Sequence, residues 1–211
     1  RTGSGKTTLV NLLLRIFEPN DSTIFLGGYN ILDIPLNVLR KSIGYVPQDN
    51  FLFSDTISNN IDFGIRNEEQ EKIIEAAKAA SVHENIVEFK HGYETLIGER
   101  GVSLSGGQKQ RISIARALIK DPEILILDDS VSAVDTDTEE KILAHLKDNR
   151  KNKTNIIIAH RISTIQDSDL IIVLDEGKII ESGNHHELLQ NKGLYSSIYE
   201  KQLLEKMLEQ E

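Results

Sequence analysis

The chain lacks several residues and segments that other classes of protein depend on. Its 211 residues include no cysteine, no tryptophan, one methionine and four prolines. The absence of cysteine excludes disulfides and thiolate metal sites and fits a reducing compartment. A net charge of −9 leaves no excess of lysine and arginine to bind a nucleic-acid backbone. No apolar run reaches the roughly 18 residues of a membrane helix, and no signal peptide is visible, so we expect any membrane part to lie upstream of Arg1.

The first eight residues carry the phosphate-loop pattern G-x-x-x-x-G-K-[ST] without its first glycine, which indicates a chain that starts inside this loop. The candidate phosphate-binding residues are Gly3, Ser4, Gly5, Lys6, Thr7 and Thr8. The glycines let backbone N–H groups surround a β-phosphate, Lys6 reaches the β and γ oxygens, and the Thr7 hydroxyl can ligate Mg²⁺. Residues 8–14 are expected to form a helix with its positive end toward the phosphates. The alternative is a Gly/Ser linker that enters a helix by chance.

A second glycine motif lies about a hundred residues later. It consists of Leu104, Ser105, Gly106, Gly107 and Gln108, and it precedes an apolar helix over residues 112–119. Ser105 and Gln108 fit a helix-capping box, which requires no function. The same geometry leaves two glycines at a helix N-terminus whose N–H groups can bind a second anion.

An apolar run at residues 124–127 leads into two carboxylates, Asp128 and Asp129. The run has the form of a buried parallel strand. Ligands of open α/β sheets bind at the carboxyl edge of such strands. A phosphate loop, a second anion site and a strand-borne Asp, in this order, are jointly specific.

At this point the chain resembles the nucleotide-binding domain of ATP-binding-cassette proteins, over essentially its whole length. The matching segments are residues 1–8 (Walker A), Gln48 (Q-loop), 104–108 (signature), 124–128 (Walker B), 132–135 (D-loop) and 158–161 (switch-histidine loop). Within the family, residues 51–57, 93–101 and 183–188 resemble exporter segments. Importer ATPases, and soluble members that act on DNA or ribosomes, are the alternatives.

The resemblance implies ATP and Mg²⁺ as cofactors and assigns roles to the polar residues. Asp128 would hold Mg²⁺ together with Thr7 and Gln48, since Mg²⁺ prefers few protein ligands plus nucleotide oxygens; a structural cap is the alternative. His160 would contact the γ-phosphate, although an isolated His is more often an ordinary core or edge residue. Ser132 and Asp135 would contact a second domain. The pair His185-His186 lacks ligands at metal-site spacing and is interpreted as surface.

One departure from the family pattern concerns catalysis. The family usually places Glu after the Walker B Asp, where it polarises the attacking water, whereas this chain has Asp129. Asp is one methylene shorter, which withdraws the carboxylate by roughly 1.5 Å. Such a displacement costs on the order of 10²-fold in rate. With Asp129, His160 and Gln48 as catalytic candidates, we expect good ATP binding and slow hydrolysis.

The resemblance also predicts the partners. Two such domains pair head to tail, so residues 104–108 would serve the partner's ATP site. A weak base beside a good signature indicates one half of a heterodimeric exporter of the multidrug-resistance type, whose partner has a Glu base; a homodimer with two slow sites is the alternative. The domain would lie on the cytoplasmic face of the cell membrane. The membrane domain and the adenine-stacking residue would precede Arg1.

The fold predicted from these patterns is α/β: a P-loop NTPase (RecA-like) core with a mainly parallel sheet and an inserted helical subdomain. We expect the core at 1–48 and 120–211, including a C-terminal helix from residue 193, and the subdomain with the signature at 49–119. Strands are predicted at 22–26, 43–47, near 124, and at 155–158, 170–174 and 178–181. Helices are predicted at 36–41, 68–81 and 84–89.

Overall fold

The computed structural model describes residues 3–65, 69–98, 101–131 and 134–208. The chain divides into two compact units. Arg1–Ile24 and Ala159–Glu211 form the terminal unit, and Phe25–Ile158 form the central unit. Each unit is described by itself below. Across the described ranges, no helix combines the length and the apolar character that crossing a membrane requires.

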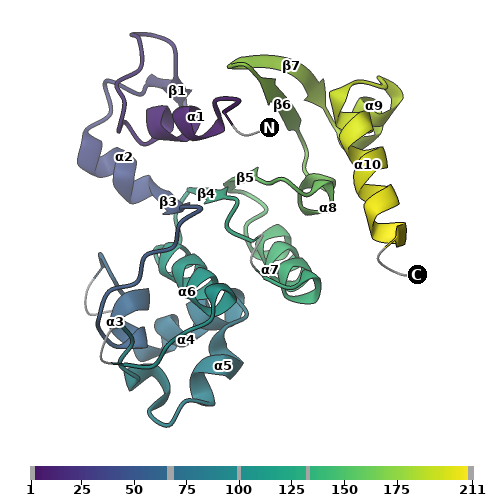
Figure 1. Cartoon of the computed structure of the whole chain (residues 1–211). Helices are drawn as coiled ribbons and strands as arrows, with labels where there is room; N and C mark the ends of the chain where they lie inside the picture. Colours follow the sequence, from purple (N-terminus) through teal and green to yellow (C-terminus); the bar gives the residue numbers. More distant parts are fainter. Residues whose placement is uncertain (1–2, 66–68, 99–100, 132–133, 209–211) are drawn as a thin grey trace. The chain divides into compact units, whose positions relative to one another are not determined.

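The central unit contains a parallel sheet of β3 (Ile43–Val46), β4 (Ile124–Asp128) and β5 (Thr154–Ile158), in that order (Figure 1). The middle strand β4 is the most apolar, and its Leu125, Ile126 and Leu127 are buried, as expected of a strand covered on both faces. Val46 pairs with Leu127, and Asp128 pairs with Ile158. All three strands therefore end at the same edge of the sheet. The three strand predictions are confirmed.

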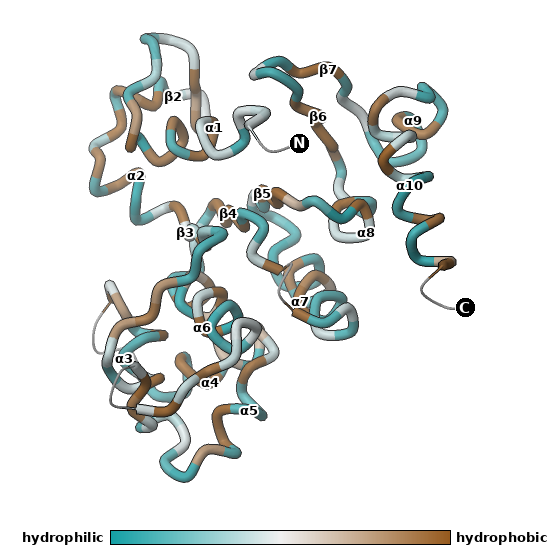
Figure 2. Tube along the Cα trace, viewed as in Figure 1, coloured by the Kyte–Doolittle hydropathy of each residue, from teal (hydrophilic) through white to brown (hydrophobic). Residues whose placement is uncertain are grey.

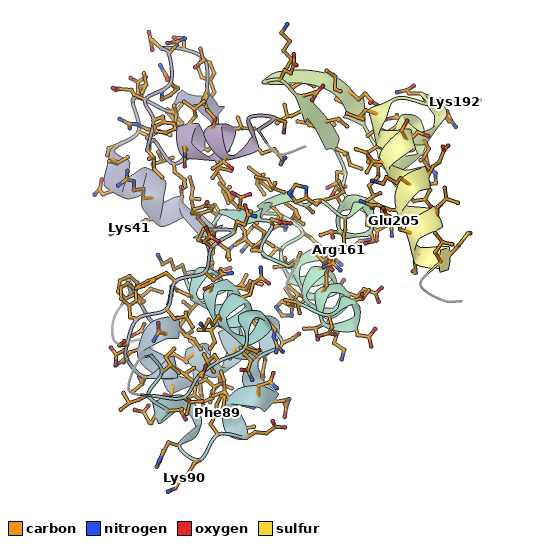
Figure 3. The ribbon with its side chains drawn as sticks, viewed as in Figure 1. Lys41, Phe89, Lys90, Arg161, Lys192 and Glu205 are labelled. Carbon is orange, nitrogen blue, oxygen red and sulfur yellow. The ribbon has the colours of Figure 1, made fainter. Side chains whose placement is uncertain are left out.

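The same unit also contains helices (Figure 1). They are α3 (Ile57–Ile61), α4 (Gln70–Ala79), α5 (His83–Val87), the 3₁₀ helix η1 (Gly92–Glu94), α6 (Gly106–Leu118) and α7 (Thr136–Asn149). Buried Ile112 and Ile114 of α6 join a core that also includes Ile73 and Ala77 of α4. Figure 3 labels Phe89 on the loop that follows α5, and its partly buried side chain packs against this core. The helices predicted near 68–81 and 84–89 are present, while residue 68 lies outside the described residues. The division into 1–48, 49–119 and 120–211 stays a prediction.

The segment before β3 in the chain agrees with one prediction and corrects another. Helix α2 (Leu36–Ser42) agrees with the prediction for 36–41. The predicted strand 22–26 is wrong: only β1 (Phe25–Leu26) is extended, paired antiparallel with β2 (Tyr29–Asn30). Ser22 has a φ of 56°, in the left-handed region, which a strand residue does not adopt.

The terminal unit combines both ends of the chain. It contains α1 (Lys6–Leu13), α8 (Ile162–Ile165), β6 (Ile171–Asp175), β7 (Lys178–Gly183), α9 (His185–Gln190) and α10 (Leu194–Leu208). Strands β6 and β7, whose apolar stretches are visible in Figure 2, form an antiparallel hairpin. Its turn, Glu176-Gly177, has positive φ at both residues (47° and 75°), as a type I′ hairpin turn requires. The strands predicted at 170–174 and 178–181 and the predicted C-terminal helix are confirmed.

Helices α3, α7, α8 and α9 were not predicted from the sequence. Three of them are only four to six residues long, which is too short for a helical period to become visible. The longer α7 is strongly polar on the surface, and its buried side chains are few: Glu139, Ile142 and Leu146. Tertiary packing rather than periodicity therefore decides these elements.

Candidate functional site

The phosphate-loop residues form a turn that only glycine adopts without strain. Gly3 has a φ of 82°, and Gly5 has a φ of 100° at the N-cap of α1. A side chain at Gly5 would also meet Gly177 Cα, 3.4 Å from the position of its Cβ. Arg1 and Thr2 lie outside the described residues. The glycine pattern of the sequence thus corresponds to a real left-handed entry into α1.

The N-terminus of α1 has no side-chain cap. Its first intrahelical bond runs from the Leu9 N–H to the Gly5 carbonyl at 3.0 Å, and the hydroxyls of Thr7 and Thr8 belong to exposed residues of the same turn. Lys6 Nζ donates to Ser4 Oγ at 3.1 Å. A positive helix end with glycine at its cap and a lysine beside it is suited to bind phosphate oxygens.

The hairpin turn supports this loop from within the terminal unit. The Gly177 N–H donates to the Ser4 carbonyl at 3.1 Å, and Ser4 is only 4% exposed. Ser4 is therefore held by backbone contacts, while the residues that follow it form the open end of α1.

At the carboxyl edge of the central sheet, Gln48 follows β3 and Asp128 ends the neighbouring strand β4. Asp128 ends β4, is buried, and accepts a hydrogen bond from the Tyr45 hydroxyl at 3.5 Å. Burial raises the pKa of Tyr45, and the negative Asp128 raises it further. Gln48 is exposed two residues beyond the end of β3. The edge thus presents carboxylate and amide oxygens of the kind that Mg²⁺ binds.

Asp129 has a constrained backbone. Its φ is 48°, a left-handed conformation that Asp tolerates better than most residues. Its N–H donates to the Ile158 carbonyl at 2.8 Å, and its carbonyl accepts from Gln110 Nε2 at 3.4 Å. Because β5 and α6 both hold this residue, its backbone cannot easily shift to extend the reach of the short side chain. The next residue, Ser130, is fully buried.

The second glycine motif is the start of α6. Ser105 is the N-cap: its Oγ accepts from the Gln108 N–H at 3.2 Å, and its own N–H donates to Gln108 Oε1 at 2.9 Å. The capping box is therefore confirmed. Gly106 and Gly107 occupy the first two helical positions, and nothing lies within 4 Å of a Cβ placed on Gly106. Leu104, just before the cap, is buried and anchors the motif in the core.

Asp135 and Ser132 were predicted as contacts to a second domain. Ser132 lies outside the described residues. Asp135 caps α7: its Oδ1 accepts from the Thr138 N–H at 3.0 Å. This bond lowers the pKa of Asp135, and the positive Arg111 adds to the effect. Capping alone accounts for Asp at this position, so the contact to another domain stays a prediction.

The three histidines considered in the sequence analysis, His160, His185 and His186, separate into two groups. His160 is exposed in the terminal unit, and its carbonyl accepts from Gln202 Nε2 of α10 at 2.7 Å. His185 Nδ1 lies 2.7 Å from the Tyr195 hydroxyl, and its ring lies edge-on to that of His186. No group of three or more potential metal-ligating side chains was found in the described ranges. The pair His185-His186 is thus explained by the packing of α9 on α10.

Two of the segments that resemble exporters lie side by side in the central unit. The Ile57 N–H donates to the Thr95 carbonyl at 3.1 Å, and the Ile97 N–H donates to the Asp55 carbonyl at 3.0 Å. Gly98 approaches Ser54 so closely that an added Cβ would overlap the Ser54 side chain. Glu99 and Arg100 lie outside the described residues.

The structure therefore distributes the predicted residues over the two units. Gln48, Asp128 and Asp129 share the sheet edge of the central unit, whereas Lys6, Thr7 and His160 belong to the terminal unit. Sequence reasoning missed Tyr45 and Gln110, which contact Asp128 and Asp129. Tyr45 could have been found as a polar residue inside an apolar strand that parallels β4. For Gln110, no local signal marks the contact.

Comparison with known proteins identifies relatives along the chain. The family model described as ABC transporter matches residues 1–132. The chain is 50% identical over 204 residues to a probable multidrug resistance ABC transporter ATP-binding/permease protein, YheI, of Bacillus subtilis, covering 97% of this chain and 35% of that protein. It is 48% identical over 202 residues to the human mitochondrial iron-sulfur clusters transporter ABCB7, covering 95% and 27%.

A solved structure shares the fold. The structure of a bacterial Atm1-family ABC exporter with ATP bound matches with a TM-score of 0.92 at 43% identity, over 96% of this chain and 36% of that one. The predicted P-loop NTPase fold is thereby confirmed. The chain spans about a third or less of the length of these relatives.

Proposed function

Since this chain belongs to the ABC transporter family, we propose that it is the ATP-binding and ATP-hydrolysing domain of an exporter. The observation that carries the proposal is the coexistence of two helix N-termini built for anions, α1 behind Gly5 and α6 behind Ser105, with a sheet edge that ends in Asp128. Phosphate binding at α1 and carboxylate chemistry at β4 match the requirements of nucleotide hydrolysis.

The residues present fit a nucleotide with Mg²⁺. The open first turn of α1 and Lys6 would hold the β- and γ-phosphates, and the oxygens of Thr7, Gln48 and Asp128 suit a hard cation. Mg²⁺, when bound, neutralises charge that develops on the phosphate oxygens. The chain itself would orient the phosphates through its backbone N–H groups and Lys6. His160 would contact the γ-phosphate from its position after β5.

Slow hydrolysis at this chain's own site is part of the proposal. Asp129 would orient the attacking water and accept its proton, but its carboxylate is about 1.5 Å short of the reach of a Glu. The left-handed backbone of Asp129, held by Ile158 and Gln110, supports the argument because it limits compensation by a backbone shift. A general base displaced to this extent loses on the order of 10²-fold in rate.

The signature would act in a partner's site. Ser105 Oγ already accepts from the Gln108 N–H, but its own proton remains available to a phosphate oxygen of a bound nucleotide. The N–H groups of Gly106 and Gly107 would add two donors. We propose a head-to-tail pair with a second ABC domain that has Glu at its base position, so that the two composite sites differ. Ser132 and Asp135 would lie at that interface.

We propose that the membrane domain is encoded upstream of Arg1. It would contact residues 51–54 and 99 on the cytoplasmic side of the membrane. Phe51 is 67% exposed and Phe53 is 37% exposed, and they follow Gln48 directly. The chain has no cysteine, so a cysteine introduced at one of these positions would be unique within it. Cysteines at 51, 53 or 99 are expected to cross-link to cysteines at the cytoplasmic ends of the membrane helices. Absence of any cross-link at all three positions would contradict this placement.

The proposed asymmetry is tested by steady-state ATPase measurements on the purified full-length transporter with its partner. Asp129→Ala is expected to change turnover by less than about twofold, because its site contributes little. Ser105→Arg is expected to reduce turnover on the order of 10²-fold, because the side chain fills the place of the partner's γ-phosphate. Replacing the partner's Glu is expected to be as severe.

Other outcomes decide between the alternatives. If both Asp129→Ala and Ser105→Arg are severe, the assembly is a homodimer whose sites all use Asp129. If neither has an effect, the chain does not form composite ATP sites, and the exporter proposal is wrong. If the gene encodes no membrane helices upstream of Arg1, the protein is instead a soluble member of the family.

A further inference from the structure

Arg116 lies near the C-terminal end of α6 and bonds to two distant parts of the central unit. Its Nε donates to the Asn60 carbonyl at 2.7 Å, its Nη2 to Asn60 Oδ1 at 2.8 Å, and its Nη1 to the Phe51 carbonyl at 2.9 Å. These partners are 56 and 65 residues away in the sequence. One side chain therefore ties α6 both to α3 and to the segment that follows Gln48.

Asn60 completes this link. It is 1% exposed, and its amide uses all of its bonding capacity. Oδ1 accepts from the Phe53 N–H at 2.9 Å and from Arg116, while Nδ2 donates to the Phe53 carbonyl at 3.0 Å and the Thr56 carbonyl at 2.9 Å. Asn60 thus holds Phe53 on both its backbone groups, as a paired strand would. The loop around Phe53 depends on this amide for its shape.

Two aromatic rings lie over the guanidinium, and a third ring packs against one of them. The Arg116 Cζ lies 5.7 Å from the ring centroid of Phe53 and 5.6 Å from that of Phe63. Phe53 stacks on Phe63 with centroids 4.2 Å apart, and Phe51 meets Phe53 edge-on at 5.0 Å. Phe51, Phe53 and Phe63, here called the aromatic surface, are all at least 37% exposed. The charged group of Arg116 thus lies directly beneath an exposed apolar patch.

The electrostatics favour a positional role for Arg116. The hydrogen-bond partners that the described residues give it are neutral carbonyl and amide oxygens, and burial lowers its pKa. The position of Arg116 in the last turn of α6 suits its charge, since the C-terminal end of a helix is negative. A planar guanidinium directs three donors in fixed directions, which a lysine cannot do. The site therefore specifies geometry rather than merely a positive charge.

We infer that Arg116 is a positioning residue that makes the aromatic surface and the signature end of α6 move as one body. Gly106 begins α6 and Arg116 lies in its last turn, so a displacement of the helix at the proposed partner site is passed to Phe51 and Phe53 through these bonds. The inference rests on the proposed function, because it assigns the signature to a partner's site and the aromatic surface to the membrane domain.

The test measures hydrogen–deuterium exchange in the purified full-length transporter, with and without Mg-ATP. In Arg116→Met, amides of residues 51–56 are expected to exchange about tenfold faster, while those of α6 change little. In the wild type, Mg-ATP is expected to slow exchange at the start of α6 and in residues 51–56 together. In Arg116→Met, only the start of α6 is expected to respond.

Two further variants separate positioning from general stability. Arg116→Lys keeps the charge but not the fixed donors, so it is expected to behave like Arg116→Met. The matched control is Arg150→Lys: Arg150 likewise donates to a carbonyl, Pro122 at 2.8 Å, and to an amide oxygen, Asn155 at 2.8 Å, and it also faces Asp121 at 3.7 Å, while none of these bonds involves Asn60 or Phe51. It is expected to leave the joint response to Mg-ATP intact.

Several results would overturn the inference. These are unchanged exchange of 51–56 in Arg116→Met, full rescue by Arg116→Lys, or a joint Mg-ATP response that survives in both Arg116 variants. A general rise of exchange throughout the domain, equal to that of Arg150→Lys, would also reject it, since the residue would then be only structural. If the wild-type protein shows no response to Mg-ATP at α1 or α6, the proposed function fails. The exchange of residues 51–56 without ligand still decides whether Arg116 links them to α6.

Discussion

The two helix N-termini that the glycine motifs create are built in opposite ways. At α1 the cap is Gly5, which has no side chain to offer, so the first-turn N–H groups are not met by a side-chain cap. At α6 the cap is Ser105, which exchanges two hydrogen bonds with Gln108. The first end is left open for the proposed phosphate ligand, whereas the second is largely completed by its own residues. A phosphate therefore matters more to the order of α1 than to that of α6.

This contrast agrees with the roles proposed for the two motifs. A loop that binds its own nucleotide can rely on that nucleotide for stability. A signature that waits for a partner's nucleotide must be folded in advance, and a capping box provides this. Substitutions at either helix N-terminus test this contrast, and their expected effects differ in size.

The largest effect is expected at α1. Lys6→Ala removes the side-chain charge beside the open helix end, and we expect Mg-ATP affinity of the full-length transporter to fall roughly 10- to 100-fold, as the loss of a charged hydrogen bond implies. Equilibrium binding of a fluorescent ATP analogue measures it. Lys41→Ala, at an exposed residue in the last turn of α2, is the control and is expected to bind normally. An unchanged affinity in Lys6→Ala would mean that α1 is not the phosphate site.

An intermediate effect is expected at α6, on stability without nucleotide. Ser105→Ala removes the acceptor for the Gln108 N–H, and loss of such a cap costs about 1 kcal/mol. For a domain of this size we expect Tm to fall by about 2–4 °C. Gln108→Glu preserves the box and is expected to retain the wild-type Tm. Equal Tm values for Ser105→Ala and the wild type would show that α6 is not stabilised by its own cap, and the contrast with α1 would disappear.

The smallest effect concerns pH and the central unit that carries α6. Burial, with a lesser contribution from Glu84, raises the pKa of Tyr93 from 10.0 to about 12. The folded state therefore keeps the proton between pH 10 and 12 while the unfolded state loses it. This stabilising contribution is complete below pH 10 and is lost as pH rises toward 12.

The corresponding variant is Tyr93→Phe. It is expected to be somewhat less stable at pH 8, because the contact between the Tyr93 hydroxyl and His83 Nδ1 at 2.8 Å is lost, but to show a flatter alkaline decline. Urea midpoints at pH 8, 9.5 and 11 measure both. Tyr29→Phe, at a side chain that is 72% exposed, should reproduce the wild-type slope. A steep decline in Tyr93→Phe equal to that of the wild type would assign the alkaline sensitivity to another group.

Much of the fold was predictable because its signals are local. The apolar run of β4, the short apolar strands on either side of Glu176-Gly177 and the C-terminal helix are each predictable from nearby residues. The strand expected from Ser22 failed because β-branched and apolar residues at 23–26 mask a left-handed backbone at Ser22. The short helices α3, α8 and α9 could not be predicted, since packing rather than periodicity holds them.

The sequence by itself determined the local geometry of the chain's glycine motifs and strand ends: Gly3 to Thr7, the Ser105–Gln108 capping box, and the carboxylates at the end of β4. Each depends on neighbours within about one helical turn or one strand, so the pattern and the geometry are nearly the same statement. Tertiary structure alone decided which side chains hold these residues in place. Tyr45 meets Asp128 across 83 positions, Gln110 meets Asp129 across 19, and Arg116 meets Asn60 across 56. Such pairs arise only when elements pack, because a buried donor takes whichever acceptor the packing brings within reach.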